Sequence, residues 1–166
     1  MAHIVTADQI MSKKLVTLRP DMDMIAAMYL LLKHRVSGAT VVDQEDRVLG
    51  VLSEKDCLRM FANGAYNELP SAHVSDYMSR TLTTIAPDTD LFTIAGIFLK
   101  SAFRRLPVVK DGKLVGQVSR RDVLDGSRAV WLSSPVKKKW TDSKYIPDEI
   151  QARLDSDIPE IADGTR

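Results

Sequence analysis

One motif occurs twice in this chain, and the duplication constrains the fold more than any other feature of the sequence. The segment MSKKLVTLRPDMD at residues 11–23 aligns with MSRTLTTIAPDTD at residues 78–90 at a constant offset of 67. After a one-residue gap, GVLSEKDCL at residues 50–58 aligns with GQVSRRDVL at residues 116–124 at an offset of 66. A chance match would not keep register over separated blocks, so we expect two copies of one structural unit.

Each copy contains the same predicted series of secondary-structure elements. A short extended segment, at 15–18 or 82–85, ends before a Pro-Asp pair, because proline biases the residue before it away from the helical conformation. Apolar residues at helical spacing then predict a helix, which in the first copy follows Asp21 and Asp23, and either of these could cap its first turn. A hairpin follows this helix, and in the second copy it has an Asp-Gly turn at 111–112. A second helix, which starts at Glu54 in the first copy and at Arg120 in the second, completes a β-α-β-β-α unit.

The two copies are expected to pack against each other. A unit of about 50 residues buries only a marginal core, whereas two units together bury a sufficient one. We therefore predict an α/β (α+β) fold in which two pseudo-symmetric β-α-β-β-α units form one module. The predicted division is residues 6–61 for the first unit, 62–72 for a linker, 73–126 for the second unit and 127–166 for a C-terminal extension.

Charge, cysteine content and hydropathy exclude several classes of protein. The 23 Lys and Arg residues against 22 Asp and Glu leave a net charge of +1, which argues against a nucleic-acid partner. The single cysteine, Cys57, cannot form an internal disulfide, and its alignment with Val123 predicts a buried structural thiol. The longest apolar run, at 24–32, is half of the about 20 residues that a membrane span needs, so we expect a cytoplasmic protein without membrane insertion.

The sequence offers no arrangement of residues that is typical of a catalyst. It contains no Ser/His/Asp chain order and no phosphate loop of the G-x-x-x-x-G-K type. Its three histidines are scattered and lack the spacing of metal ligands. We therefore expect that the chain is not an enzyme and holds neither a catalytic cofactor nor a metal.

The doubled unit resembles a known family. The MS pair near the start of each copy, the PD pair before the first helix, the VV strand and the G-x-x-S-x-x-D segment are similar to a tandem pair of cystathionine β-synthase (CBS) domains, called a Bateman module. The resemblance covers about residues 6 to 126 and implies a regulatory sensor with two clefts for adenosine ligands such as AMP, ADP, ATP or S-adenosylmethionine. It also implies a flat, disc-like homodimer that acts on a separate effector protein.

The S-x-x-D segments are the first candidate site residues. Ser53 and Asp56, like Ser119 and Asp122, stand where a strand gives way to a helix, and a helix N-terminus attracts phosphate through its free N–H groups and its dipole. The resemblance implies that the serine meets phosphate and the aspartate accepts hydrogen bonds from ribose. The alternative is a capping box, in which each aspartate bonds back to its own serine.

Four arginines of the second copy are the next candidates. Arg120 and Arg121 lie inside the second S-x-x-D segment, and Arg104 and Arg105 precede the second VV strand. Because the planar guanidinium suits phosphate oxygens, we expect the cleft of the second copy to take the anionic end of the ligand. The alternative is that these arginines only solvate a helix face.

The remaining candidates lie on strands. Thr17 and Thr84 occupy the first strand of each copy, where the resemblance implies a hydroxyl near the nucleotide, although β propensity alone also explains them. Ala39 in the first copy and Leu106, followed by Pro107, in the second match the position that meets the adenine edge. Core packing is the alternative for their side chains.

A second class of function stays open at this point. The chain could be a ligand-free interaction scaffold, in which the repeats serve dimerisation and the aromatic residues of the C-terminal extension, Trp131, Trp140 and Tyr145, serve docking. A sensor retains or accepts an adenosine nucleotide, and a scaffold does not, so ligand binding separates the two interpretations.

Overall fold

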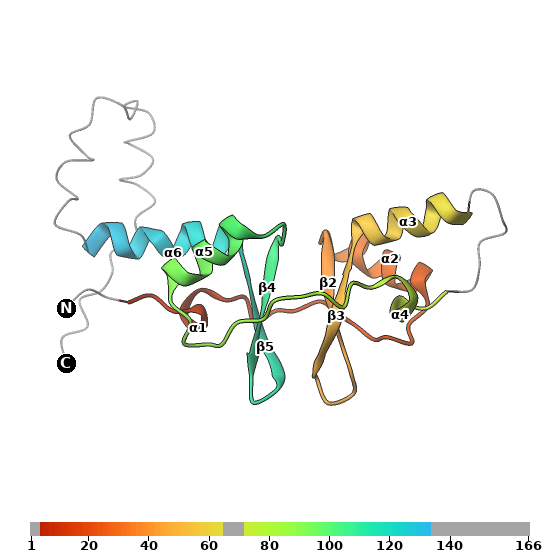
Figure 1. The fold of residues 1–166 in the computed structure, drawn as a ribbon, viewed down its shortest axis with the longest axis horizontal. Coiled ribbons are helices and arrows are strands. Elements are labelled where there is room, and N and C mark those ends of the chain that lie inside the picture. Colours follow the sequence, from red (N-terminus) through yellow and green to blue (C-terminus); the bar gives the residue numbers. More distant parts are fainter. Residues whose placement is uncertain (1–3, 65–71, 134–166) are drawn as a thin grey trace, which may run out of the picture.

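The computed structural model describes residues 4–64 and 72–133, which form two similar halves that lie side by side (Figure 1). The four long helices lie on one side of the sheets, and the hairpin turns project from the other side. None of the helices in these two ranges is long and apolar enough to cross a membrane. The expected α/β (α+β) fold of two pseudo-symmetric units is confirmed.

The first repeat has the predicted order of elements. They are β1 (Thr17–Leu18), α2 (Met24–His34), β2 (Gly38–Val42), β3 (Val48–Ser53) and α3 (Glu54–Gly64). β2 lies between β1, with which it is parallel, and β3, with which it is antiparallel. Asp23 caps α2, because its carboxylate accepts hydrogen bonds from the backbone N–H groups of Ile25 and Ala26 at 2.8 and 3.1 Å.

The second repeat follows the same path with a shorter first strand. Its elements are α5 (Leu91–Lys100), β4 (Arg105–Lys110), β5 (Lys113–Ser119) and α6 (Arg120–Ser133). Asp111 and Gly112 both have positive φ, at 50° and 77°, as the predicted two-residue turn requires. The strand expected at 82–85 is reduced to one parallel bridge between Ile85 and Val108, so its predicted extent was wrong.

Two short helices that the sequence analysis missed exchange places between the halves (Figure 1). α1 (Ala7–Ile10) lies at the start of the first repeat in sequence but packs into the core of the second half, and α4 (Val74–Tyr77) lies at the start of the second repeat but packs into the core of the first half. The backbone N–H of Leu91 donates to the carbonyl of Val5 at 2.9 Å, and that of Val74 donates to the carbonyl of Met22 at 2.9 Å.

The exchange means that each packed half is built from two separate stretches of chain. The first core contains Ala72, Val74 and Met78, and the second contains Val5 and Ala7. The predicted ranges 6–61 and 73–126 follow the repeats in sequence and therefore do not coincide with the packed halves. Residues 65–71 of the predicted linker and 134–166 of the predicted extension lie outside the described residues, as do Trp140 and Tyr145.

After each short helix the chain crosses to the other half along a strand edge. Ser12 forms an antiparallel bridge with Gln117 of β5, and Ser79 forms one with Val51 of β3. At each crossing the Met of the MS pair packs on the glycine of the G-x-x-S segment, Met11 on Gly116 and Met78 on Gly50. The repeated MS and G residues are therefore explained by the close approach of each crossing segment to the strand that carries the glycine.

Candidate functional site

A groove of about 700 Å³ opens where the two repeats meet, and both repeats line it. The first repeat contributes the ends of β2 and β3 and the first two turns of α3, with Ser53, Lys55 and Arg59 among its residues. The crossing segment after α4 contributes Ser79 and residues 81–83, and the second repeat contributes residues 102–105 with Pro107 and Gln117. The groove therefore exists only because the chain crosses between the halves.

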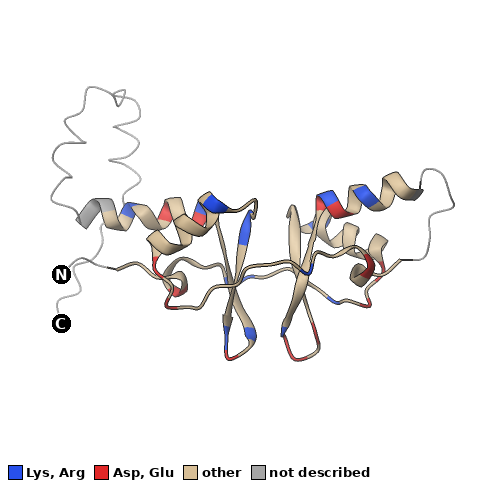
Figure 2. Ribbon diagram, in the orientation of Figure 1, with Lys and Arg blue, Asp and Glu red and all other residues tan. Residues whose placement is uncertain are grey.

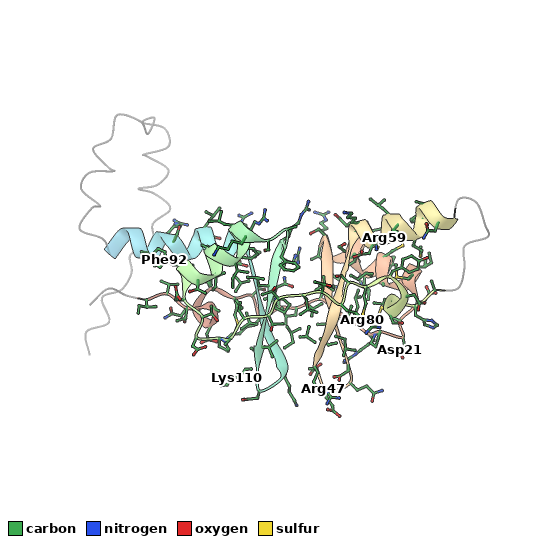
Figure 3. All side chains as sticks on the ribbon, in the orientation of Figure 1. Asp21, Arg47, Arg59, Arg80, Phe92 and Lys110 are labelled. Atoms are coloured by element: carbon green, nitrogen blue, oxygen red, sulfur yellow. The ribbon has the colours of Figure 1, made fainter. Side chains whose placement is uncertain are left out.

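The first S-x-x-D segment lies on the wall of this groove, at the start of α3. Asp56 is buried, with 7% of its surface exposed, and its Oδ2 accepts hydrogen bonds from the Ser53 N–H at 2.9 Å and the Ser53 hydroxyl at 2.6 Å. Its Oδ1 pairs at 3.3 Å with the guanidinium of Arg59, which lies on α3 (Figure 3). Ser53 and Asp56 thus form the capping arrangement that was given above as the alternative.

The second S-x-x-D segment makes the same bonds at the start of α6. Asp122 accepts from the Ser119 N–H at 2.6 Å and from the Ser119 hydroxyl at 2.7 Å. Neither residue lines the inter-repeat groove; Asp122 instead borders a separate depression of about 450 Å³ between α1 and α6. The nucleotide-binding roles expected for both pairs stay predictions, and the two pairs lie in different surroundings.

The structure separates the four arginines that the sequence analysis placed in one cleft. Arg104 and Arg105 line the groove of the first motif, together with Ser53 and Asp56. The Arg105 Nη2 donates to the Ser37 hydroxyl at 3.4 Å and so connects the two repeats. The sequence analysis missed this grouping because the side chains come from opposite repeats, which only the crossing brings together.

Arg120 and Arg121, inside the second motif, do not line the groove. The Arg120 Nη2 donates to the carbonyl oxygens of Phe103 at 3.1 Å and Ser101 at 3.5 Å, and its guanidinium carbon lies 5.9 Å from the centre of the Phe98 ring. Arg121 is exposed on the first turn of α6. Figure 2 shows basic residues, in blue, at the starts of β4, α3 and α6.

The candidates on strands are divided in the same way. Ala39 and Pro107 line the groove, whereas Leu106 is completely buried in the core of the second half, as its alternative interpretation holds. Thr17 is half-buried opposite Thr40 in the β1–β2 pair, and Thr84 is exposed. Neither threonine is a lining residue.

Several lining residues were not among the predicted ones. Tyr77, Leu82 and Thr83 come from α4 and the crossing segment, Leu58 comes from α3, and Phe103 comes from the loop before β4. Leu58 has 67% of its surface exposed, which is unusual for a leucine that follows a helical pattern. The repeat alignment carried no signal for the crossing segment, because the exchange of α1 and α4 cannot be read from one sequence.

Cys57 follows Asp56 on α3 and is a buried thiol. Cys57 has 7% of its surface exposed on α3, and burial raises the pKa of its thiol, with a further increase from the charges of Asp56 and Glu54. A thiol with a raised pKa stays protonated at neutral pH and is a weak nucleophile. Within residues 4–64 and 72–133, no cluster of His, Cys, Asp and Glu has the arrangement of a metal site.

Two tandem segments with an S-x-x-D helix start and a crossing MS pair match a known family model. The CBS domain model matches residues 7–63 and 74–128. The chain belongs to the CBS domain family. This CBS pair shares 30% identity over 117 residues with an uncharacterized protein of Methanocaldococcus jannaschii, and the match covers 70% of this chain and 40% of the relative. It shares 30% identity over 116 residues with a 17.7 kDa protein of Acidianus ambivalens, covering 69% of this chain and 68% of the relative.

Solved CBS-pair structures have the same fold. CBSX2, whose structure was solved in complex with AMP, superposes on this CBS pair with a TM-score of 0.67 at 29% identity. That match covers 75% of this chain and 97% of CBSX2. Another structure of CBSX2, from Arabidopsis thaliana, superposes with a TM-score of 0.69 at 27% identity and covers 78% of this chain and 98% of the other.

Proposed function

We propose that this CBS pair is a regulatory module that binds a phosphorylated adenosine ligand, AMP, ADP or ATP, in the groove between its repeats. The observation that carries the proposal is the composition of the groove, in which Ser53 and Asp56 of one repeat lie with Arg104 and Arg105 of the other. The crystal structure of CBSX2 with AMP supports the ligand class. A ligand that contacts both repeats stabilises one relative pose of the halves, which is the physical requirement for a sensor.

The charges of the groove favour a phosphate over a cationic ligand. Lys55, Arg59, Arg104 and Arg105 supply four positive charges, and Glu54 and Asp56 supply two negative charges. S-adenosylmethionine carries a sulfonium and an amine against one carboxylate, so a positive groove repels it relative to AMP. Arginine also forms paired hydrogen bonds with phosphate oxygens. We therefore rank the adenine nucleotides above S-adenosylmethionine.

The roles of the residues follow from their positions. The Ser53 hydroxyl stands at the start of α3, where the helix dipole favours an anion, and Arg104 and Arg105 meet the phosphate from the opposite wall. The Asp56 carboxylate accepts ribose hydrogen bonds once the ligand displaces part of its bonding to Ser53. Ala39, Leu58 and Phe103 supply apolar surface of the kind that flanks a purine ring.

The helical side of the module fits a second copy of the chain. Exposed apolar residues follow one stripe of α2, where Ile25, Tyr29 and Leu32 are 52%, 64% and 73% exposed. α5 repeats the pattern with Phe92 and Leu99, which are 73% and 88% exposed. Because both halves present such a stripe, a second copy related by a twofold axis would cover the stripes of α2 and α5 together, and we propose a homodimer. We further propose that this homodimer transmits the ligand state to a separate effector protein.

One observation favours the alternative of a ligand-free dimeric scaffold. Asp56 and Asp122 both bond to their own serines, so each helix start is satisfied without a ligand. The sensor proposal requires that a nucleotide competes with these bonds, whereas the scaffold requires that nothing does. The open groove with its four cationic side chains favours the sensor.

A thermal-shift panel of AMP, ADP, ATP and S-adenosylmethionine tests the proposal. A ligand that binds only the folded state at 100 times its Kd adds about 2.7 kcal/mol to the free energy of unfolding, which raises the Tm measurably. We expect a rise with at least one adenine nucleotide, and a smaller rise in the Arg104→Ala variant. The absence of any shift, together with native mass spectra that show a dimer without nucleotide, would support the scaffold.

A further inference from the structure

The end of helix α5 is held by a side chain from a different element. α5 ends at Lys100, and Ser101 leaves the helix in an extended conformation with φ −131° and ψ 159°. The last carbonyl groups of a helix lack partners inside it, and the backbone just beyond is free to move unless something holds it. The Arg120 guanidinium donates to the carbonyls of Ser101 and Phe103 and lies near the face of the buried Phe98 ring.

The first repeat ends its equivalent helix by other means. α2 ends at His34, and the residue after it, Arg35, adopts the left-handed conformation with φ 52° and ψ 44° and donates its own backbone N–H to the carbonyls of Leu31 and Leu32. At the offset of 66, Glu54 occupies the position of Arg120. A carboxylate only accepts hydrogen bonds, so Glu54 cannot donate to carbonyl oxygens as Arg120 does. The Arg120 contacts are therefore particular to the second repeat and are not a requirement of the repeated fold.

The segment that Arg120 holds is one wall of the inter-repeat groove. Residues 102–105 line the groove, and Arg105 reaches Ser37 of the first repeat across it. Arg120 itself is not a lining residue. We propose that Arg120, although it belongs to the second S-x-x-D segment, is a positioning residue for ligand binding at the first one, because it fixes the wall that carries Arg104 and Arg105.

The physical basis is preorganisation. Fixing the backbone of a residue costs conformational entropy, and a wall that is already ordered before binding loses little further entropy when the ligand binds. Loss of the Arg120 contacts leaves residues 102–104 to be ordered by the phosphate itself. The effect therefore concerns ligands that reach Arg104 and Arg105, and it is smaller for a ligand without phosphate.

The proposal rests on nucleotide binding in the groove, and calorimetric titration of the full chain with AMP and with adenosine tests it. We expect Arg120→Ala to weaken AMP binding about fivefold, which corresponds to one lost hydrogen-bonded contact, and to weaken adenosine binding less. Arg128→Ala removes the same charge from an exposed position further along α6 and is the matched control. We expect AMP affinity in that variant to equal that of the wild type.

A double-mutant cycle separates positioning from direct contact. If Arg120 acts through the wall arginines, Arg120→Ala has little further effect in a background that already carries Arg104→Ala and Arg105→Ala. An undiminished loss of affinity in that background would overturn the proposal, as would equal losses in Arg120→Ala and Arg128→Ala. If the wild type binds AMP and Arg104 matters while Arg120 does not, the positioning role fails and the proposed function stands.

A measurement without ligand keeps the positioning role testable even if AMP does not bind. Hydrogen–deuterium exchange followed by mass spectrometry reports local opening of the backbone. We expect faster exchange in the peptide that covers residues 101–106 in Arg120→Ala, and unchanged exchange there in Arg128→Ala. Unchanged exchange of this peptide in Arg120→Ala would contradict the structural basis of the proposal, whatever the ligand.

Discussion

The substitution Gly50→Ala tests the crossing that builds the groove. A Cβ atom at Gly50 would lie 2.6 Å from the backbone oxygen of Ser79 and 3.1 Å from the sulfur of Met78. Carbon atoms and their neighbours are at optimal separation at about 3.5–4.0 Å, so the crossing backbone must move away from β3. That movement stretches the two bonds between Val51 and Ser79, which are each 2.9 Å long.

The expected cost follows from these contacts. Overpacking of this kind costs about 1–3 kcal/mol, and each weakened backbone hydrogen bond adds about 0.5–1.5 kcal/mol. Because alanine loses less backbone entropy on folding than glycine, the substitution in a strand also stabilises the folded state by about 0.5–1 kcal/mol. We therefore expect Gly50→Ala to lower the free energy of unfolding by about 1–5 kcal/mol, and the Tm by several degrees or more.

The matched control is the same change at Gly96. That glycine lies inside α5, and a Cβ atom there would meet nothing within 4 Å, so alanine should raise stability by about 0.8–1.0 kcal/mol through helix propensity. Urea unfolding with linear extrapolation measures both variants on one scale. The reasoning is refuted if Gly50→Ala is as stable as the wild type, or if both variants shift the midpoint in the same direction.

Two further predictions concern ionisable groups. The Thr93 hydroxyl and backbone N–H groups at the start of α5 hold the pKa of Asp90 below its usual value. The stabilisation that the Asp90 carboxylate contributes is therefore present at neutral pH and is lost as the pH falls through about 4 and below. Asp90→Ala should therefore have a lower Tm than the wild type at pH 7, and the difference should shrink in acid; a constant difference from pH 7 to pH 3 would contradict this. Cys57, whose pKa is raised by burial, should react slowly with iodoacetamide in the folded protein and rapidly in urea, and equal rates in both would show that the thiol is not protected.

The local structure of each repeat could be predicted from the sequence because it rests on local signals. Asp23 and Asp90 cap the helices that follow them, and the turn at Asp111 and Gly112 has the backbone angles that such a pair favours. The helices begin at Glu54 and Arg120, as predicted. Each of these features depends on residues a few positions apart.

The composition of the groove could not be predicted in the same way, since it depends on contacts between distant residues. Nothing in the alignment of the repeats shows that Ala7 packs in the second core or that Val74 packs in the first. Because the exchange stayed hidden, Arg104 and Arg105 were assigned to the second motif rather than to Ser53 and Asp56. Leu106 illustrates a further ambiguity, because an apolar residue on a strand fits a binding site and a core equally well until burial is known.

Amide chemical-shift mapping with AMP tests the central claim, that the ligand lies between the two repeats, most directly. On addition of AMP to the ¹⁵N-labelled full chain, we predict that shifts change at Ser53 and Lys55 in the first repeat and at Phe103 and Arg105 in the second, with one common saturation curve. Changes confined to one repeat, or no changes at millimolar AMP, would contradict the account.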